Sequence, residues 1–75
     1  MTNETTKLVK LGRNIYNARK RNSLSQNQLA EMLDISREHL AKLETGKRRI
    51  SLKLLFKLSD LLKVSESDLM CFTDK

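Results

Sequence analysis

Residues 25–46 have the sequence SQNQLAEMLDISREHLAKLETG, in which the start signals of two short helices follow each other closely. Ser25 stands three residues before Gln28, which is the spacing of a capping box. In this motif a hydroxyl and an amide side chain each satisfy a backbone N–H group at a helix start. The pattern predicts a helix from Gln26 to about Leu33.

A second helix start follows at Ser36, whose hydroxyl is placed to accept a hydrogen bond from the first turn. Leu40 and Leu43 then share the inward face, and Gly46 ends the helix because glycine can take a left-handed conformation. Two helices of about eight residues, joined by a short connection that contains Asp34, suit a helix-turn-helix unit with one helix presented outward.

Apolar residues at helical spacing also precede and follow this unit. We expect one helix before it, from about Thr6 to Asn22. After it, Ser51 is placed to cap a fourth helix, and Ser65 with Asp68 begins a short fifth helix. The residues expected to face the core in the first and fourth helices are Leu8, Leu11, Ile15, Ala18, Leu54, Leu55, Leu58, Leu61 and Leu62. Proline is absent and no stretch alternates as a strand would, so the sequence predicts an all-α fold of five helices.

The composition indicates one compact domain and a polyanionic partner. The 75 residues are 39% hydrophobic and 32% charged, which suits a single domain over residues 1–75 with one modest core. Lys and Arg number 15 against 9 Asp and Glu, a formal net charge of +6. This excess favours nucleic acid first and an anionic membrane surface second. The membrane surface is disfavoured because the apolar faces belong to several capped helices that can bury one another.

Cysteine content and hydropathy predict the compartment. Cys71 is the only cysteine, so no intramolecular disulfide is possible, which suits a reducing environment. The first six residues are polar, and no apolar run approaches the ~20 residues of a membrane span. We therefore expect a cytoplasmic protein that does not associate with a membrane.

No sequence pattern indicates catalysis, a metal site or a cofactor. His39 has no second histidine and no suitably spaced cysteine with which to share a metal ion. Cys71 lacks an accompanying catalytic His or Asp arrangement and is interpreted as a small apolar residue near the C-terminus. The chain also has no Gly-rich phosphate loop and no paired carboxylate motif, so we expect no enzyme activity, no cofactor and no metal.

Residues 25–46 strongly resemble the phage repressor and Cro family, also called the xenobiotic-response-element family of regulators, and the likeness covers roughly Leu11 to Leu69. In its size, and in the stretch GKRRISL at residues 46–52, the chain also resembles the controller proteins of restriction-modification systems. The resemblance implies a transcriptional repressor or activator with a five-helix DNA-binding domain. Residues of about 36–45 would enter the major groove, while the preceding helix would lie across the phosphate backbone.

The resemblance assigns base contacts to the start of the outward helix. The matching positions hold Arg37, Glu38 and Lys42, with His39 beside them. Arg37 can donate two hydrogen bonds to guanine and Glu38 can accept one from cytosine N4, so GC-containing half-sites are favoured. Both side chains can equally reach phosphates, and Glu38 can also serve simply as a favourable charge at a helix N-terminus.

Phosphate contacts are implied at the start of the first helix of the unit and in the loop after the outward helix. These positions hold Gln26, Lys47, Arg48 and Arg49. A helix N-terminus favours an anion, and clustered cations can straddle a phosphate strand. The basic loop is equally compatible with an ordinary run of solvated charges.

Two further positions follow from the resemblance. Arg19 and Glu44 match a pair that bridges the first helix and the end of the outward helix, a structural pair that would contribute little at the surface. Asp34 stands where the family often has glycine in the turn, and aspartate tolerates a left-handed conformation better than most residues.

A second copy of the chain is an expected partner, because one short recognition helix sees only a few base pairs. Two half-sites about 34 Å apart would restore specificity, so we expect a homodimer that reads an inverted repeat in double-stranded DNA. Leu69, Met70 and Phe72 are the predicted interface, unless these side chains only cap the core. The alternative function is an antitoxin-like module of the same fold, which binds a protein partner and also its own promoter.

Overall fold

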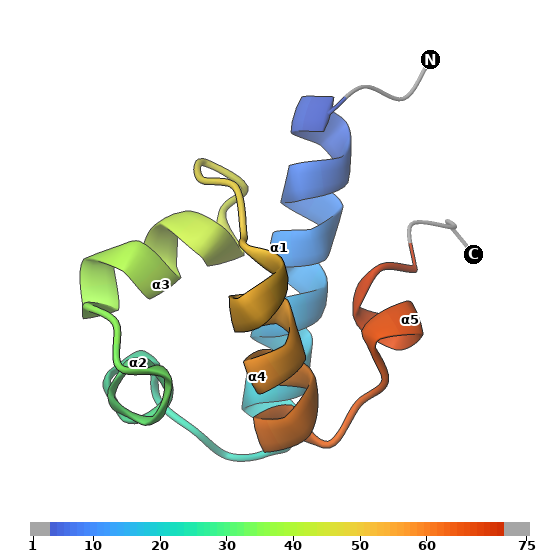
Figure 1. The fold of residues 1–75 in the computed structure, drawn as a ribbon. Coiled ribbons are helices and arrows are strands. Elements are labelled where there is room, and N and C mark those ends of the chain that lie inside the picture. Colours follow the sequence, from blue (N-terminus) through green and yellow to red (C-terminus); the bar gives the residue numbers. More distant parts are fainter. Residues whose placement is uncertain (1–3, 72–75) are drawn as a thin grey trace.

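Five helices make up residues 4–71, the part of the chain that the computed structural model describes (Figure 1). They are α1 (Glu4–Arg21), α2 (Gln26–Leu33), α3 (Arg37–Glu44), α4 (Leu52–Leu62) and α5 (Glu66–Leu69). The predicted all-α fold, with a helix-turn-helix formed by α2 and α3, is confirmed. The main difference in helix bounds is that α1 begins at Glu4 instead of about Thr6.

A serine caps the start of each helix from α2 to α5. The hydroxyls of Ser25, Ser36, Ser51 and Ser65 each accept a hydrogen bond from the backbone N–H three residues later. Around Ser25 the capping box is complete, because the Ser25 N–H donates to the Gln28 side chain at 2.8 Å. The predicted helix starts are therefore confirmed, and local hydrogen bonding explains them.

Left-handed residues mark the ends of α2 and α3. Asp34 has φ 60° and ψ 43°, so aspartate does take the left-handed conformation that the turn requires. Gly46 has φ +77° and follows Thr45, the C-cap of α3. The N–H of Lys47 donates to the Lys42 carbonyl at 2.9 Å, which gives a Schellman-type ending and turns the chain away from α3.

Leucine side chains dominate the core, which lies between the five helices. Figure 1 shows α4 in front of α1, with α2 and α3 to one side of this pair and α5 to the other. The buried apolar residues are Leu11, Ile15, Ala18, Leu29, Ala30, Leu33, Leu40, Leu43, Leu54, Leu55, Leu58, Leu62 and Leu69. Leu8 and Leu61, which the spacing placed inward, are only half-buried. Over residues 4–71, no helix combines the length and the apolar character that crossing a membrane requires.

The backbones of α1 and α3 approach each other closely. A Cβ atom added at Gly12 would lie 2.4 Å from the carbonyl oxygen of Leu43 and 2.5 Å from that of Glu44. Real Cβ atoms essentially never come so near, so Gly12 permits the last turn of α3 to lie against α1. Gly46 allows a second close approach, because an added Cβ there would lie 2.6 Å from the Cα of Val9.

A buried ion pair joins the same two helices. Arg19 Nε donates to Glu44 Oε2 at 2.7 Å, and Arg19 Nη2 donates to Glu44 Oε1 at 3.1 Å. Their side chains are 7% and 4% exposed, so the expected pair is present but does not lie at the surface. Arg19 Nη1 also donates to the Leu24 carbonyl at 2.8 Å. The pair therefore connects α1, the segment before α2 and the end of α3.

Candidate DNA-binding surface

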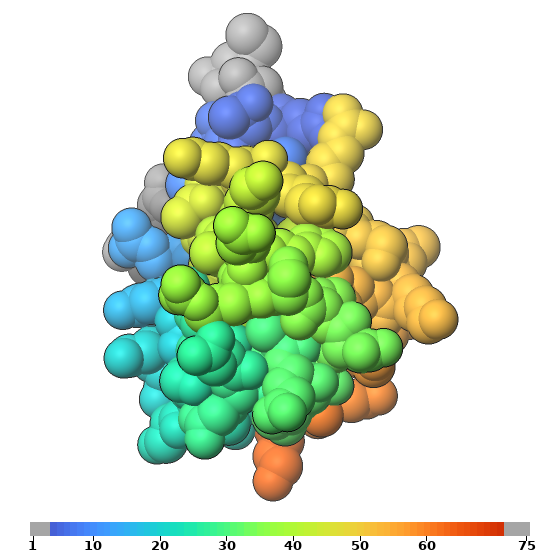
Figure 2. Space-filling view, turned by 90° about the vertical axis from the view of Figure 1, so that its left-hand side faces the viewer, coloured from blue at the N-terminus to red at the C-terminus, as the bar shows by residue number. Residues whose placement is uncertain are grey.

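The first turn of α3 is open to solvent. Arg37 and Glu38 are exposed, Lys42 is exposed one turn later, and His39 is half-buried between them. In Figure 1 the start of α3 lies at the outer left of the molecule, and Figure 2 looks directly onto that side, with α3 near the centre. Four side chains with hydrogen-bonding groups are thus presented on one protruding helix.

Positive charge surrounds His39. Burial lowers the pKa of His39 from its usual value of 6.5, and the charges of Arg48 and Lys42 lower this pKa further. The imidazole is therefore mainly neutral at pH 7. The same effect shows that Arg48, from the loop after α3, acts electrostatically on the α3 surface. Arg48, a predicted phosphate contact, and Lys42, a predicted base contact, therefore both lie near His39.

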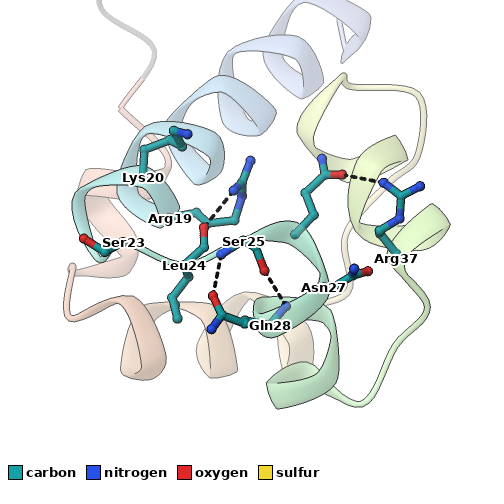
Figure 3. A pocket seen from close by; sticks show the side chains of 9 residues that line it. Arg19, Lys20, Ser23, Leu24, Ser25, Asn27, Gln28 and Arg37 are labelled. Atoms are coloured by element: carbon teal, nitrogen blue, oxygen red, sulfur yellow. Dashed lines mark hydrogen bonds between the residues drawn. The ribbon is translucent and has the colours of Figure 1, made fainter.

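A hollow of about 760 Å³ lies at the start of α2 (Figure 3). It is lined by Arg19, Lys20, residues 23–28 and Arg37. The capping box uses the backbone N–H groups of Ser25 and Gln28. The N–H groups of residues 26 and 27 have no carbonyl acceptor within the helix, because they belong to its first turn. Free N–H groups next to Lys20 and Arg37 make this hollow suitable for an anion.

Gln26, a predicted phosphate contact, connects this hollow to two other parts of the fold. Its Nε2 donates to Glu44 Oε1 at 2.9 Å, so the buried ion pair holds the amide in place. Its Oε1 accepts a long hydrogen bond of 3.5 Å from Arg37 Nη1. Gln26 therefore fixes the start of α2 relative to α3, and Arg37 keeps other N–H donors for a further partner.

The hollow also contains Lys20 and Asn27, which were not among the predicted contacts. Lys20 comes from the last turn of α1, and Asn27 is the second residue of α2. Figure 3 shows Lys20 and Arg37 on either side of the α2 start. Lys20 had the appropriate charge, but only the path of the chain from the end of α1 through residues 23–25 brings it to the hollow. Asn27 could have been found from its place in the first turn of α2.

The loop after α3 presents three cations with different surroundings. Lys47, Arg48 and Arg49 are all exposed. Arg49 Nη2 donates to Glu4 Oε1 at 2.8 Å, and the two side chains form an exposed ion pair. A phosphate that binds Arg49 must therefore compete with the Glu4 carboxylate, whereas among residues 4–71 neither Lys47 nor Arg48 forms an ion pair with a carboxylate. In Figure 2 this loop lies directly above α3.

The predicted dimer residues do not share one environment. Leu69 is only 1% exposed and packs in the chain's own core, so it is not available to a second copy. Asn14 Nδ2 donates to the Leu69 carbonyl at 2.7 Å, which holds α5 against α1. Met70 is 45% exposed, and Phe72 lies outside the described residues. Within those residues, the predicted interface therefore retains only Met70, the C-cap of α5.

Residues 15–69 match the sequence model of the HTH_3 helix-turn-helix family. The chain belongs to this family. The match covers most of the chain and includes both helices of the motif, so the suspected membership of the Cro and phage-repressor type is confirmed. Over residues 4–71, no group of three His, Cys, Asp or Glu side chains could hold a metal ion.

Solved structures of other regulators are similar to this chain in fold and sequence. The restriction-modification controller protein C.AhdI from Aeromonas hydrophila is similar at 32% identity and a TM-score of 0.77, over 83% of this chain and 94% of that one. The clp gene regulator ClgR from Corynebacterium glutamicum has 27% identity and a TM-score of 0.78, over 83% and 80% of the two chains. A hypothetical transcription factor from Neisseria, at 22% identity and a TM-score of 0.81 over 95% and 82%, shares the fold. The comparison with curated proteins gave no match. This helix-turn-helix protein is a DNA-binding transcriptional regulator.

Proposed function

We propose that this regulator binds a specific double-stranded operator by placing α3 in the major groove. Arg37, Glu38, His39 and Lys42 would face base edges. The functional unit is a single domain of residues 1–75, which acts in the cytoplasm without a cofactor or a catalytic step.

The observation that carries this proposal is the position of α3 between two cationic surfaces. At one side, the hollow at the α2 start offers Lys20, Gln26 and backbone N–H groups. Next to α3 on another side, the loop offers Lys47 and Arg48. Such groups bind phosphates without regard to sequence and hold the duplex in register, while the helix between them contacts the bases.

The first turn of α3 has the chemistry of base recognition. Arg37 is exposed and its recorded side-chain hydrogen bond, to Gln26, is long at 3.5 Å, so its remaining N–H groups can pair with guanine O6 and N7. Glu38 is exposed and can accept a hydrogen bond from cytosine N4. These two side chains support a preference for G and C within each half-site.

A homodimer on an inverted repeat completes the proposal. The eight residues of α3 span about 12 Å, which is enough for only a few base pairs. A two-fold arrangement doubles the number of bases that are read and therefore the discrimination against other sites.

Selection of bound duplexes from a randomised pool tests this function. We expect enrichment of a two-fold symmetric sequence, with G or C at the positions nearest Arg37 and Glu38. Recovery of sequences indistinguishable from the starting pool, although the protein binds DNA, would contradict sequence-specific recognition. Enrichment of a sequence without two-fold symmetry would contradict the inverted repeat alone.

A further inference from the structure

A second groove, the α1 groove, lies between α1 and the end of α3. Its volume is about 660 Å³, and Val9, Arg13 and Tyr16 line it from α1. Gln26 lines both this groove and the hollow at the α2 start, so the two meet at that residue. In Figure 2, side chains of α1 form the left-hand edge of the face that carries α3, and the start of α4 forms its right-hand edge. The α1 groove therefore extends the candidate DNA surface toward α1.

Three side chains with hydrogen-bond donors follow one face of α1. Arg13, Tyr16 and Lys20 are separated by three and four residues, which places them in a row along the helix. All three are exposed. Arg13 and Tyr16 line the α1 groove and Lys20 lines the hollow, so the row passes from one to the other. This span of the helix rises about 10 Å, which matches the axial rise of about three nucleotides of one DNA strand.

Arg13 and Tyr16 hold the available donors of the α1 groove. Within residues 4–71, neither the Arg13 guanidinium nor the Tyr16 hydroxyl has a hydrogen-bond or ion-pair partner. Thr45, on the opposite wall, donates its hydroxyl to a carbonyl of α3 at 3.1 Å. Gln26 Nε2 is likewise used, because it donates to Glu44. An acceptor that enters the groove therefore meets Arg13 and Tyr16.

Negative charge in the α1 groove is already compensated. Among the described residues that line it, Glu44 carries the one carboxylate, and both of its oxygens accept from Arg19. The Glu44 side chain is also only 4% exposed. The Arg19 guanidinium carbon lies 5.2 Å from the centre of the Tyr16 ring, so the same cation holds this ring beside the groove. The uncompensated charge of the groove is therefore the positive charge of Arg13.

We propose that the α1 groove binds the DNA backbone next to the bases read by α3, with Arg13 and the Tyr16 hydroxyl donating to phosphate oxygens. The inference deepens the proposed function and rests on it for the placement of the duplex against α3. The phosphates belong to the strand that Lys20 holds at the α2 start. The contact carries no base information, and it lengthens the stretch of backbone that each copy covers.

Charge and continuity favour a nucleic-acid backbone over a protein ligand in this groove. The chain has a formal net charge of +6, and the groove joins a hollow that offers helix N–H groups and Lys20. A nucleic-acid strand alternates anionic phosphates with less polar sugars. Val9 is 46% exposed in the same groove, so its methyl groups can pack against a deoxyribose while Arg13 pairs with a phosphate.

The salt dependence of DNA binding by the full chain tests the Arg13 contact. Two duplexes of equal length serve as probes, one selected from the randomised pool and one of unrelated sequence. Arg13→Gln should reduce the slope of log affinity against log salt by about one unit on both, because a phosphate contact does not depend on sequence. Arg21→Gln is the matched control: it removes the same charge from the same helix, but Arg21 lines a different hollow next to α5. An unchanged slope for Arg13→Gln, or an equal reduction in the control, would overturn the proposal.

Neutral phosphates locate the contact. A methylphosphonate that replaces one contacted phosphate of the selected duplex should weaken wild-type binding by about 10-fold, because a charge-assisted hydrogen bond is lost. At one position next to the selected bases, Arg13→Gln should lose this sensitivity, while Arg21→Gln keeps it. Equal sensitivity of the wild type and Arg13→Gln at every position would show that Arg13 contacts no phosphate. The groove would then be left to a protein ligand.

Tyr16→Phe tests the second donor. The variant keeps the ring beside Arg19 and removes only the hydroxyl, so binding to both duplexes should weaken about threefold. The salt slope should stay at the wild-type value, because a neutral donor releases no counterion. Denaturant unfolding should also be unchanged, since the hydroxyl has no partner within residues 4–71. Wild-type affinity in Tyr16→Phe would overturn the Tyr16 contact.

The duplex of unrelated sequence separates failure of this inference from failure of the proposed function. A chain that prefers no sequence, but whose slope falls in Arg13→Gln, would contradict the operator proposal alone. A chain that selects an operator while Arg13→Gln keeps the wild-type slope would contradict the α1 groove alone. Circular dichroism of each variant should show wild-type helicity, because Arg13, Tyr16 and Arg21 are exposed.

Discussion

Two surfaces next to α3 are both open to solvent but differ in chemistry. At the α2 start, Lys20, Gln26 and Asn27 line a polar hollow with helix N–H groups at its base. At the α4 edge, Leu52 and Phe56 offer apolar surface next to the exposed charges of Lys53, Lys57 and Asp60. The first suits a phosphate backbone, and the second suits another protein surface. The scaffold helices around the motif therefore give the two sides of α3 different surface chemistry.

The two surfaces also depend differently on the core. Gln26 is tied to Glu44, and Glu44 to Arg19, so the hollow depends on a buried ion pair. The exposed face of α4 depends on ordinary leucine packing, with Leu54, Leu55 and Leu58 on the other side of the same helix. A change at the ion pair should therefore disturb the DNA side before it affects the α4 side.

The largest expected effect comes from breaking that ion pair. Glu44→Ala leaves the Arg19 guanidinium buried at 7% exposure without its carboxylate, so we expect the free energy of unfolding to fall by about 3–5 kcal/mol. Denaturant unfolding followed by circular dichroism measures this change. A double variant with Arg19→Met and Glu44→Leu should regain most of the loss, because no buried charge remains unpaired. A loss below about 1 kcal/mol in Glu44→Ala would show that water replaces the carboxylate.

A smaller effect is expected at the protruding turn of α3. Arg37→Ala should weaken binding to the best operator by roughly 1–3 kcal/mol and relax the preference at one base position in each half-site. Titration of a set of operators with single substitutions measures both quantities. Equal weakening on every duplex, including unrelated sequences, would instead identify Arg37 as a phosphate contact.

Replacement of one lysine on each side compares the two surfaces directly. On a duplex with a single half-site, Lys20→Ala should reduce the slope of log affinity against log salt by about one unit, because one phosphate contact is lost. Lys53→Ala is the matched control, because it removes the same charge from the α4 edge and should leave that slope unchanged. Equal slopes for the two variants would mean that the hollow holds no phosphate.

The smallest expected effect concerns the pH dependence of stability. The pKa of His39 is lowered by burial and by the charges of Arg48 and Lys42, so below the usual value of 6.5 the unfolded chain binds more protons than the folded one. The contribution to stability is fully present above pH 6.5 and declines as the pH falls from there toward the lowered pKa of the folded state. His39→Gln should remove this part of the pH dependence in urea unfolding between pH 7.5 and 5.5. An identical pH dependence in the variant would show that other groups cause it.

Much of the fold could be predicted because its signals are local. Serine caps, an aspartate in the turn and glycine after α3 each act within one turn of a helix, so the residues that form them are close in sequence. The placement of Leu69 could not be predicted in this way. Whether a leucine near the chain end is buried depends on how α5 packs against α1 and α4, which local spacing does not determine.

The residues of the candidate site also fall into two groups, those that the sequence could predict and those that it could not. The protruding residues Arg37, Glu38 and Lys42 follow from the position of the helix start, because side-chain direction in a helix is fixed by residue number. The participation of Lys20 does not follow, because it comes from a different helix. The reduced availability of Arg49 was also hidden, since its partner Glu4 is 45 residues away in the chain.

The sequence by itself determined the number of helices, their starts and the identity of the outward helix, because capping and helical periodicity are short-range effects. Only the tertiary structure decided which helices contact α3 and which surfaces lie next to it. Gly12 allows α3 to touch α1, and the Arg19–Glu44 pair becomes buried only when those helices meet. Leu52 and Phe56 are likewise exposed because the other described helices cover other residues of α4. Such long-range contacts depend on the relative positions of whole helices, and these are set by the combined packing of the core.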